Sequence, residues 1–161
     1  MTVAPLVAIE DLPRLLGHET RLLGLDVGTK TIGMALSDVT RSIATPYDTV
    51  HRTKFTADAK SLLEVIETHG VGGLVIGLPI NLDGSEGPRA QSTRAFARNL
   101  GSHVEVPMVF WDERFSTAAV ERHLIEADAS RKRRAEVIDR MAAAYILQGA
   151  LDRLKRLAEL R

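Results

Sequence analysis

The amino-acid sequence predicts a mixed α/β domain, in which an antiparallel meander of three strands leads into two parallel strands that alternate with helices. Two observations support this fold class. Short apolar runs of strand length follow one another near the start of the chain, with only turn residues between them. Beyond residue 54 the apolar spacing changes to a helical period, and two further apolar runs separate the helical segments. This order predicts a five-stranded mixed sheet flanked by helices.

The first strand is expected at 22–27, after an N-terminal extension (1–20) that contains two prolines and precedes the main domain (21–161). The apolar run LLGLDV ends in the sequence GTKT, which predicts a tight turn. Gly28 can adopt a positive φ in such a turn. The residues IGMALSD then predict the second strand, at 32–38.

The third strand is expected at 42–50, where Pro46 favours an edge position because it cannot donate a backbone hydrogen bond. Apolar residues at helical spacing predict a helix over 56–69, and Gly70 stands where a helix C-cap belongs. The uninterrupted apolar run at 73–79 is typical of a strand that is buried on both faces.

The second half of the chain repeats the alternation of helix and strand. Residues 84–101 indicate a loop that leads into a helix, and 106–113 indicate another buried strand. A short helix at 117–126 and a long helix at 135–160 follow. The basic run RKRR at 131–134 is the densest positive stretch of the chain.

Composition narrows the possible functions. A length of 161 residues, with 45% apolar and 26% charged residues, is typical of one globular domain. Net charge is zero, so any polyanion must be bound locally and not through bulk charge. Cysteine is absent, which excludes thiolate zinc sites and cysteine nucleophiles, and no apolar run or signal pattern suits a membrane or secretion. We therefore expect a cytoplasmic protein without a membrane partner.

Acidic residues stand at the ends of two predicted strands, where ligands of α/β sheets gather. Asp26 ends the first strand, and Asp112 and Glu113 end the last. Side chains alternate along a strand, so only one of Asp112 and Glu113 can face the same side as the site. Each position also has a structural interpretation, because Asp26 could cap the turn and Asp112 or Glu113 could cap the next helix.

Asp139 interrupts the apolar stripe of the long predicted helix. Its helical neighbours include Ala142 and Ala143, so its carboxylate is expected to be buried. A buried carboxylate requires a cation or another partner. That partner is either a metal ion or an arginine such as Arg114 or Arg140.

Acidic residues from three separate elements, with only scattered histidines, predict oxygen ligands for Mg²⁺ or Mn²⁺. Such ions can activate water and stabilise a leaving oxygen, as cleavage of a phosphodiester requires. The turn after the first strand, the loop GLPINLDGSEG and the basic run could contact phosphates. The candidate nucleic-acid-binding residues are Lys30, Asn81, Arg114, Arg131, Lys132, Arg133 and Arg134.

Four sequence blocks together resemble the YqgF family of Holliday-junction-resolvase-like and pre-16S rRNA nuclease proteins. They are GLDVGTKTIGMALSD, LVIGLPINLDGSEGPRA, VFWDERFSTAAVE and VIDRMAAAYILQGALD. The resemblance covers roughly Arg21 to Arg153 and implies an RNase H-like fold. It also implies a catalytic, metal-binding triad of Asp26, Glu113 and Asp139.

The resemblance implies a metal-dependent endonuclease that processes the 5′ end of precursor 16S rRNA in ribosomal precursor particles, as a monomer or homodimer. Resolvases of the RuvC type place a second acid one turn after the first in the last helix, whereas this chain has Ala142 there. RNA is therefore favoured over branched DNA. The alternatives are a Holliday-junction resolvase, a non-catalytic RNA-binding assembly factor and an ATP-binding module, since several ATPases also begin with a D-x-G-T turn.

Overall fold

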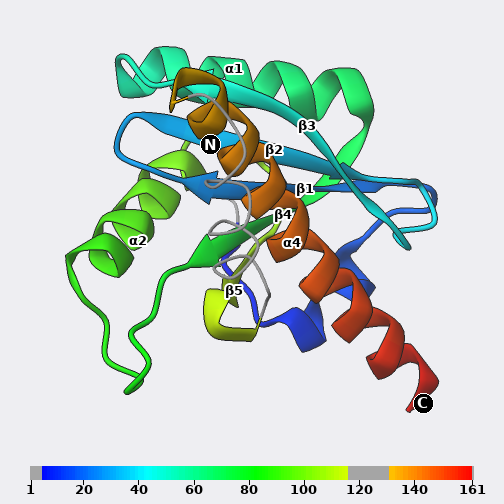
Figure 1. Cartoon of the computed structure of the whole chain (residues 1–161). Helices are drawn as coiled ribbons and strands as arrows, with labels where there is room; N and C mark the ends of the chain where they lie inside the picture. Colours follow the sequence, from blue (N-terminus) through cyan, green and yellow to red (C-terminus); the bar gives the residue numbers. More distant parts are fainter. Residues whose placement is uncertain (1–4, 116–130, 161) are drawn as a thin grey trace.

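The computed structural model describes residues 5–115 and 131–160, apart from the side chains of 115 and 131–136, and confirms the mixed five-stranded sheet (Figure 1). Its strands are β1 (Arg21–Val27), β2 (Thr31–Ser37), β3 (Ala44–His51), β4 (Val71–Leu78) and β5 (Met108–Asp112). Its helices are α1 (Phe55–His69), α2 (Pro88–Gly101) and α4 (Arg131–Glu159), with short 3₁₀ turns at Ile9–Asp11, Pro13–Leu15 and Glu113–Phe115.

The strand order is β3-β2-β1-β4-β5, with antiparallel pairing among β1, β2 and β3 and parallel pairing of β4 with both β1 and β5. The strand β3 is an edge strand, as Pro46 predicts. Its pairing with β2 shifts between Met34 and Ala35, where Pro46 and Asp48 flank a bulged Tyr47. The three carboxyl-terminal ends of β1, β4 and β5 therefore meet at one edge of the sheet.

The two faces of the sheet bury different clusters of apolar residues. On one face, α1 and α2 pack against alternate residues of the strands, such as Leu23, Leu25 and Ile76. On the other face, α4 covers the intervening residues, which include Leu22 and Val75 (Figure 1). The sequences of β1 and β4 are nearly continuous apolar runs because both faces of these strands are buried, whereas the edge strand β3 is largely exposed.

Glycines in the sheet allow α4 to approach it closely. A Cβ atom at Gly24 would lie 2.7 Å from Leu147 Cβ, and one at Gly77 would lie 2.4 Å from Ile146 Cδ1. At Gly33 the obstacle is the helix backbone itself, because an added Cβ would lie 2.0 Å from the carbonyl oxygen of Asp139. The glycines therefore determine how near the side chains of α4 come to the strands.

The N-terminal segment packs onto the domain. Val7 N–H donates to the Met108 carbonyl (2.9 Å), and Leu6 forms an isolated parallel bridge with Met108 at the edge of β5. Leu12 is fully buried in the cluster beneath α4. Residues 5–16 thus add contacts to the domain core, while the division of the chain at residue 20 stays a prediction.

Three local expectations require correction or fall outside the described residues. Gly28 does not adopt a positive φ; instead, its N–H donates to the Thr31 carbonyl (2.8 Å) across the turn. A side chain there would crowd this contact, since an added Cβ would lie 3.1 Å from the same oxygen. The helix α4 begins at Arg131, four residues before its predicted start, because basic residues are good helix formers. The helix expected at 117–126 lies outside the described residues.

The helix C-cap predicted at Gly70 is confirmed. Gly70 ends α1 in the left-handed conformation, with φ at 63° and its N–H bonded to the Ile66 carbonyl. Pro88 occupies the first turn of α2, where its missing N–H costs nothing. Within the described residues, no helix combines the length and apolar character that crossing a membrane demands.

Candidate active site

Asp26 lies at the end of β1, on the face that α4 covers. Along β1, Leu22 and Gly24 contact α4 or its cluster, and alternation places Asp26 on the same side. Its side chain is only 6% exposed. A carboxylate is therefore held at the edge of an otherwise apolar face.

The backbone of Asp139 packs on β2 at the position that pairs with Asp26, and Asp139 is half-buried, not buried as the sequence predicts. Gly33 is the register partner of Asp26 on β2, and the backbone of Asp139 rests on Gly33. The Thr31 hydroxyl, two residues before Gly33 and on the same face, donates a hydrogen bond to Asp139 Oδ2. The contact of α4 with a strand glycine thus brings two carboxylates from positions 113 residues apart in the chain to one place.

Glu113 reaches the same face from the end of β5. Trp111 packs against α4, since its Nε1 lies 2.9 Å from the place that a Gly149 Cβ would occupy. Two residues further, Glu113 Cγ lies 3.3 Å from the corresponding position at Gly77. Because Leu25 pairs with Ile76, Gly77 follows beside Asp26 on the neighbouring strand. Glu113 and not Asp112 therefore lies toward Asp26.

Asp112 turns to the opposite side and binds Arg114. The Arg114 guanidinium donates to Asp112 Oδ2 (Nη2, 2.7 Å), and the Arg114 backbone N–H donates to Asp112 Oδ1 (2.9 Å). Burial alone would raise the pKa of Asp112, but the hydrogen bonds and charge of Arg114 outweigh it and lower that pKa. Asp112 thus caps the 3₁₀ turn that carries Glu113. The helix that Asp112 or Glu113 was expected to cap lies outside the described residues.

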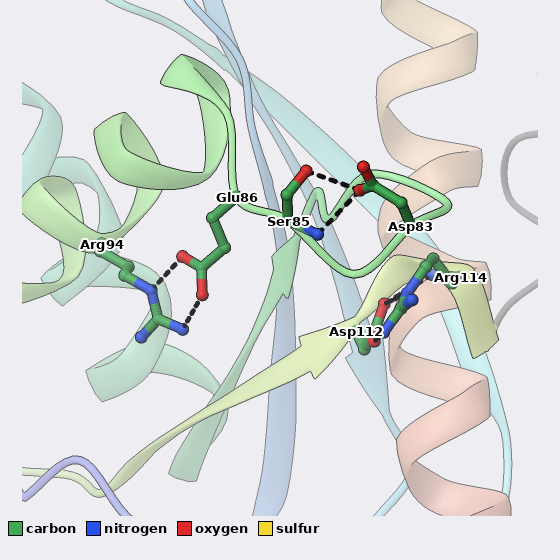
Figure 2. Close-up of polar contacts among 6 residues, drawn as sticks. All are labelled: Asp83, Ser85, Glu86, Arg94, Asp112 and Arg114. Atoms are coloured by element: carbon green, nitrogen blue, oxygen red, sulfur yellow. Dashed lines mark hydrogen bonds and ion pairs between the residues drawn. The ribbon is translucent and has the colours of Figure 1, made fainter.

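The loop between β4 and α2 borders the same end of the sheet. Figure 2 shows Asp83 beside the Asp112–Arg114 pair and Glu86 paired with Arg94 further along. Asn81 accepts a hydrogen bond from Gly84 N–H through its carbonyl and donates one to the Ser85 carbonyl, so it closes the loop. Its side-chain amide donates to Ser85 Oγ (3.0 Å), so this predicted phosphate ligand shapes the loop.

The other predicted phosphate contacts are spread over the same end of the molecule. Lys30 is exposed in the turn between β1 and β2, shortly after Asp26 in the sequence. Arg114 binds Asp112, which leaves it only part of its donors for a phosphate. The basic run starts α4, but the side chains at 131–134 lie outside the described residues.

The three acidic residues do not form a ready-made metal cage. Among the described residues, no group of three or more acidic or histidine side chains is close enough to hold a metal ion. No ion pair of Asp139 with Arg114 or Arg140 is found in this part of the chain, and its oxygen is bonded to Thr31. The donor chemistry nevertheless fits a hard cation, because all three groups are carboxylates.

Two residues with evident roles were missed from the sequence. Thr31 holds Asp139, and Arg52 donates to the Gly28 carbonyl (Nη1 to O, 2.6 Å) from the end of β3. Arg52 also lies 3.7 Å from the buried carboxylate of Asp58 and stacks over Phe96. Small residues at alternate positions of β2 could have indicated the face of Thr31, but no local pattern points to Arg52.

Two hollows of the described surface lie away from these carboxylates. One of about 330 Å³ lies beside the C-terminal half of α4, between Leu16, Arg41 and Leu154. Another of about 430 Å³ lies between β3 and α1 and includes Tyr47 and Glu64.

The family described as "RuvX: Holliday junction resolvase" matches residues 20–153. A protein of Paramagnetospirillum magneticum named "Putative pre-16S rRNA nuclease" is 63% identical over 148 residues, which are 92% of this chain and 96% of that protein. A protein of Methylocella silvestris with the same name is 59% identical over 154 residues, or 96% of each chain.

A solved structure of T. thermophilus RuvC in complex with a Holliday junction substrate has a similar fold, with a TM-score of 0.53. Its sequence is 12% identical, and the match covers 84% of this chain and 96% of that one. At this identity the likeness concerns the fold, and it confirms the RNase H-like architecture.

Proposed function

This chain belongs to the RuvX family, and from that premise we propose that it is a metal-dependent endonuclease acting on structured nucleic acid. The chain is a hydrolase of phosphodiester bonds, in line with relatives of about 60% identity. One observation carries the assignment of the site. Asp26, Glu113 and Asp139 come from two strand ends and a helix, yet all three lie on one face at one edge of the sheet.

Asp26, Glu113 and Asp139 would hold Mg²⁺ or Mn²⁺, for which carboxylate oxygens are the preferred ligands. When bound, such an ion supplies an activated water and stabilises the charge of the leaving oxygen. Asp26 is buried on the face of α4, and Thr31 orients Asp139 by its hydrogen bond. Asp112 is bound by Arg114, whereas Glu113 lies toward Asp26.

Precursor 16S rRNA, cut at its 5′ end within ribosomal precursor particles, is the favoured substrate. Two relatives that match nearly the whole chain are named as pre-16S rRNA nucleases, which supports this choice of RNA. Ala142 also lies buried one turn after Asp139, where it supplies no further carboxylate. Branched DNA is the second candidate, and it rests on the description of the family as Holliday junction resolvases.

The decisive experiment compares cleavage of a structured RNA that spans the 5′ end of 16S rRNA with cleavage of a four-way DNA junction, each in Mg²⁺ and in Mn²⁺. Glu113→Gln and Asp26→Asn should each remove nearly all cleavage, because residues that act as a unit give large and non-additive losses. Asp112→Asn is the matched control. It neutralises the adjacent carboxylate, which faces the other way, and should keep kcat within a fewfold of the wild type.

Three outcomes contradict the proposal. Full activity in Asp26→Asn or Glu113→Gln would remove that residue from the site. Salt-dependent RNA binding without cleavage in either metal would favour a non-catalytic assembly factor. Micromolar ATP binding without nuclease activity would favour an ATP-binding module.

A further inference from the structure

Leu82 is the most exposed large apolar residue among those described, with 95% of its surface accessible. It lies in the loop between β4 and α2, within a turn that Asn81 and Gly84 close. Turns normally place polar residues or glycine at such positions. A single exposed leucine is common on protein surfaces. This leucine differs because the hydrogen bonds of its loop hold it in a fixed position.

The loop holds Leu82 on a rigid frame. Gly84 N–H donates to the Asn81 carbonyl (2.8 Å) and Asn81 N–H to the Ser85 carbonyl (2.9 Å). Gly84 adopts a φ of 90°, which only glycine reaches without strain. Asp83 Oδ1 accepts hydrogen bonds from both the N–H and the hydroxyl of Ser85 (Figure 2). Because the backbone on both sides of Leu82 is fixed, its side chain is presented outward.

The acidic groups of the loop are satisfied internally. The Ser85 hydroxyl and backbone N–H lower the pKa of Asp83, and the Arg94 guanidinium lowers the pKa of Glu86. Arg94 is itself held by Glu86 and by the ring of Phe110, 5.0 Å away. In this described loop the charges are thus used to build the frame, and the tip offers an apolar surface.

The loop also borders the strand end that precedes Glu113. The loop begins directly after β4, whose last residue, Leu78, pairs with Asp112 on β5. Arg114 Nη1 lies 3.8 Å from the place that a Gly84 Cβ would occupy, and Arg114 follows Glu113 in the chain. The leucine and the carboxylates therefore border the same edge of the sheet.

We propose that Leu82 is an apolar wedge that packs against an unstacked base of the nucleic-acid substrate, next to the phosphodiester that is cut. This inference rests on the proposed function and narrows its substrate to junctions between paired and unpaired nucleotides. A rigid apolar tip beside a phosphate-cleaving site suits a nucleobase, because insertion of leucine beside a base step unstacks it. RNA offers such splayed bases at loops, bulges and duplex ends.

The test uses a hairpin RNA with 2-aminopurine at its duplex–single-strand junction, because this base fluoresces more strongly when it is unstacked. The protein carries Asp26→Asn, Mg²⁺ is present, and the RNA is recovered intact afterwards. Leu82→Ala in this background should abolish most of the fluorescence rise and weaken binding to the junction about threefold to tenfold, as expected for a leucine that is partly buried on binding. Affinity for a fully paired duplex should not change.

Two matched variants isolate the side chain. Ile43→Ala removes another exposed aliphatic residue, 64% accessible and remote from the acidic edge, and should leave the signal intact. Leu82→Met keeps an apolar side chain of similar volume and should preserve both the rise and the affinity.

An unchanged fluorescence rise in Leu82→Ala would overturn the inference, while cleavage by the wild type would leave the proposed function standing. Altered sedimentation of Leu82→Ala without RNA would also overturn it and would assign the tip to a contact with a second copy of the chain. The readout needs no cleavage. A wild type that cuts neither substrate but shows the Leu82-dependent rise would therefore refute the nuclease and retain the wedge.

Discussion

Replacement of Gly33 by alanine tests whether the distance between β2 and α4 sets the geometry of the site. An added Cβ would lie 2.0 Å from the carbonyl oxygen of Asp139 and 2.4 Å from its carbonyl carbon. Carbon and oxygen atoms that are not bonded normally stay at least about 3.3 Å apart. The helix must therefore move away from the strand by about 1.3 Å at Asp139, because neither contact is with a flexible side chain.

The loss of activity should exceed the loss of stability. Overpacking of this kind typically costs about 1 to 3 kcal/mol of unfolding free energy. A displacement of about 1 Å at a catalytic group can lower the rate about 100-fold. Asp139 would move away from Asp26 in Gly33→Ala, so kcat should fall about 100-fold in protein that remains folded at the assay temperature.

Gly70→Ala provides the matched control. Gly70 has a φ of 63°, and an added Cβ would meet no atom within 4 Å. Its alanine variant should lose about 1 to 2 kcal/mol through backbone strain without moving α4. Unfolding by denaturant, followed by measurement of kcat on the RNA substrate, separates the two variants. If folded Gly33→Ala kept the kcat of the wild type, the proposed dependence of the site on this contact would be refuted.

Three further predictions concern charge. Alanine at 131–134 should flatten the slope of log affinity against log salt by roughly 0.7 to 0.9 per lost phosphate contact, and an unchanged slope would mark the run as ordinary surface. Asp139→Asn should leave the metal-free protein equally stable or more stable than the wild type. Mn²⁺ should raise the melting temperature of this variant less than that of the wild type. Strong destabilisation of the metal-free variant would instead indicate that Asp139 forms a structural ion pair. The N–H groups of Ile43 and Ser42 and the hydroxyl of Thr40 lower the pKa of Asp38 to about 2. Asp38 should therefore stabilise the protein above its usual pKa near 3.8, and this stabilisation should be lost as pH falls through about 2. The melting temperature of Asp38→Asn should be lower than that of the wild type near neutral pH, and the two melting temperatures should converge in acid.

Most of the fold is predictable because each element carries a local signal. The strands β1 and β4 are buried on both faces, so their apolar runs are continuous and easily recognised. Pro46 marks the edge and Gly70 the end of α1, each through a constraint of its own backbone. The conformation of Gly28 could not be predicted, since glycine is compatible with many turn conformations. A side chain at Gly28 would be crowded by the Thr31 carbonyl, and not strained by a positive φ as the sequence suggests.

The candidate site is less predictable, because its acidic residues are brought together by contacts between distant segments. Alternation along the strand predicted at 106–113 indicates that Asp112 and Glu113 face opposite sides, but it does not say which side carries α4. In the structure β5 ends at Asp112, and Glu113 begins the 3₁₀ turn. The packing of Trp111 against Gly149 decides that question, and it joins residues 38 positions apart. The side of the sheet on which each acid lies is therefore a property of tertiary packing, although the acid itself is visible in the sequence.

The glycines link this packing to the proposed chemistry. Gly33, the register partner of Asp26, lets the backbone of Asp139 pack directly on β2. Gly77 lies on β4, next to β1, and leaves room for the side chain of Glu113. A side chain at either position would separate the carboxylates before any of them was altered. The three acids do not form a closed metal cage in the described structure. Their proposed function therefore depends on the close packing of α4 and Glu113 against the sheet, which Gly33 and Gly77 make sterically possible. Variants at Gly33 and Gly77 should consequently impair cleavage while every acidic residue is still present.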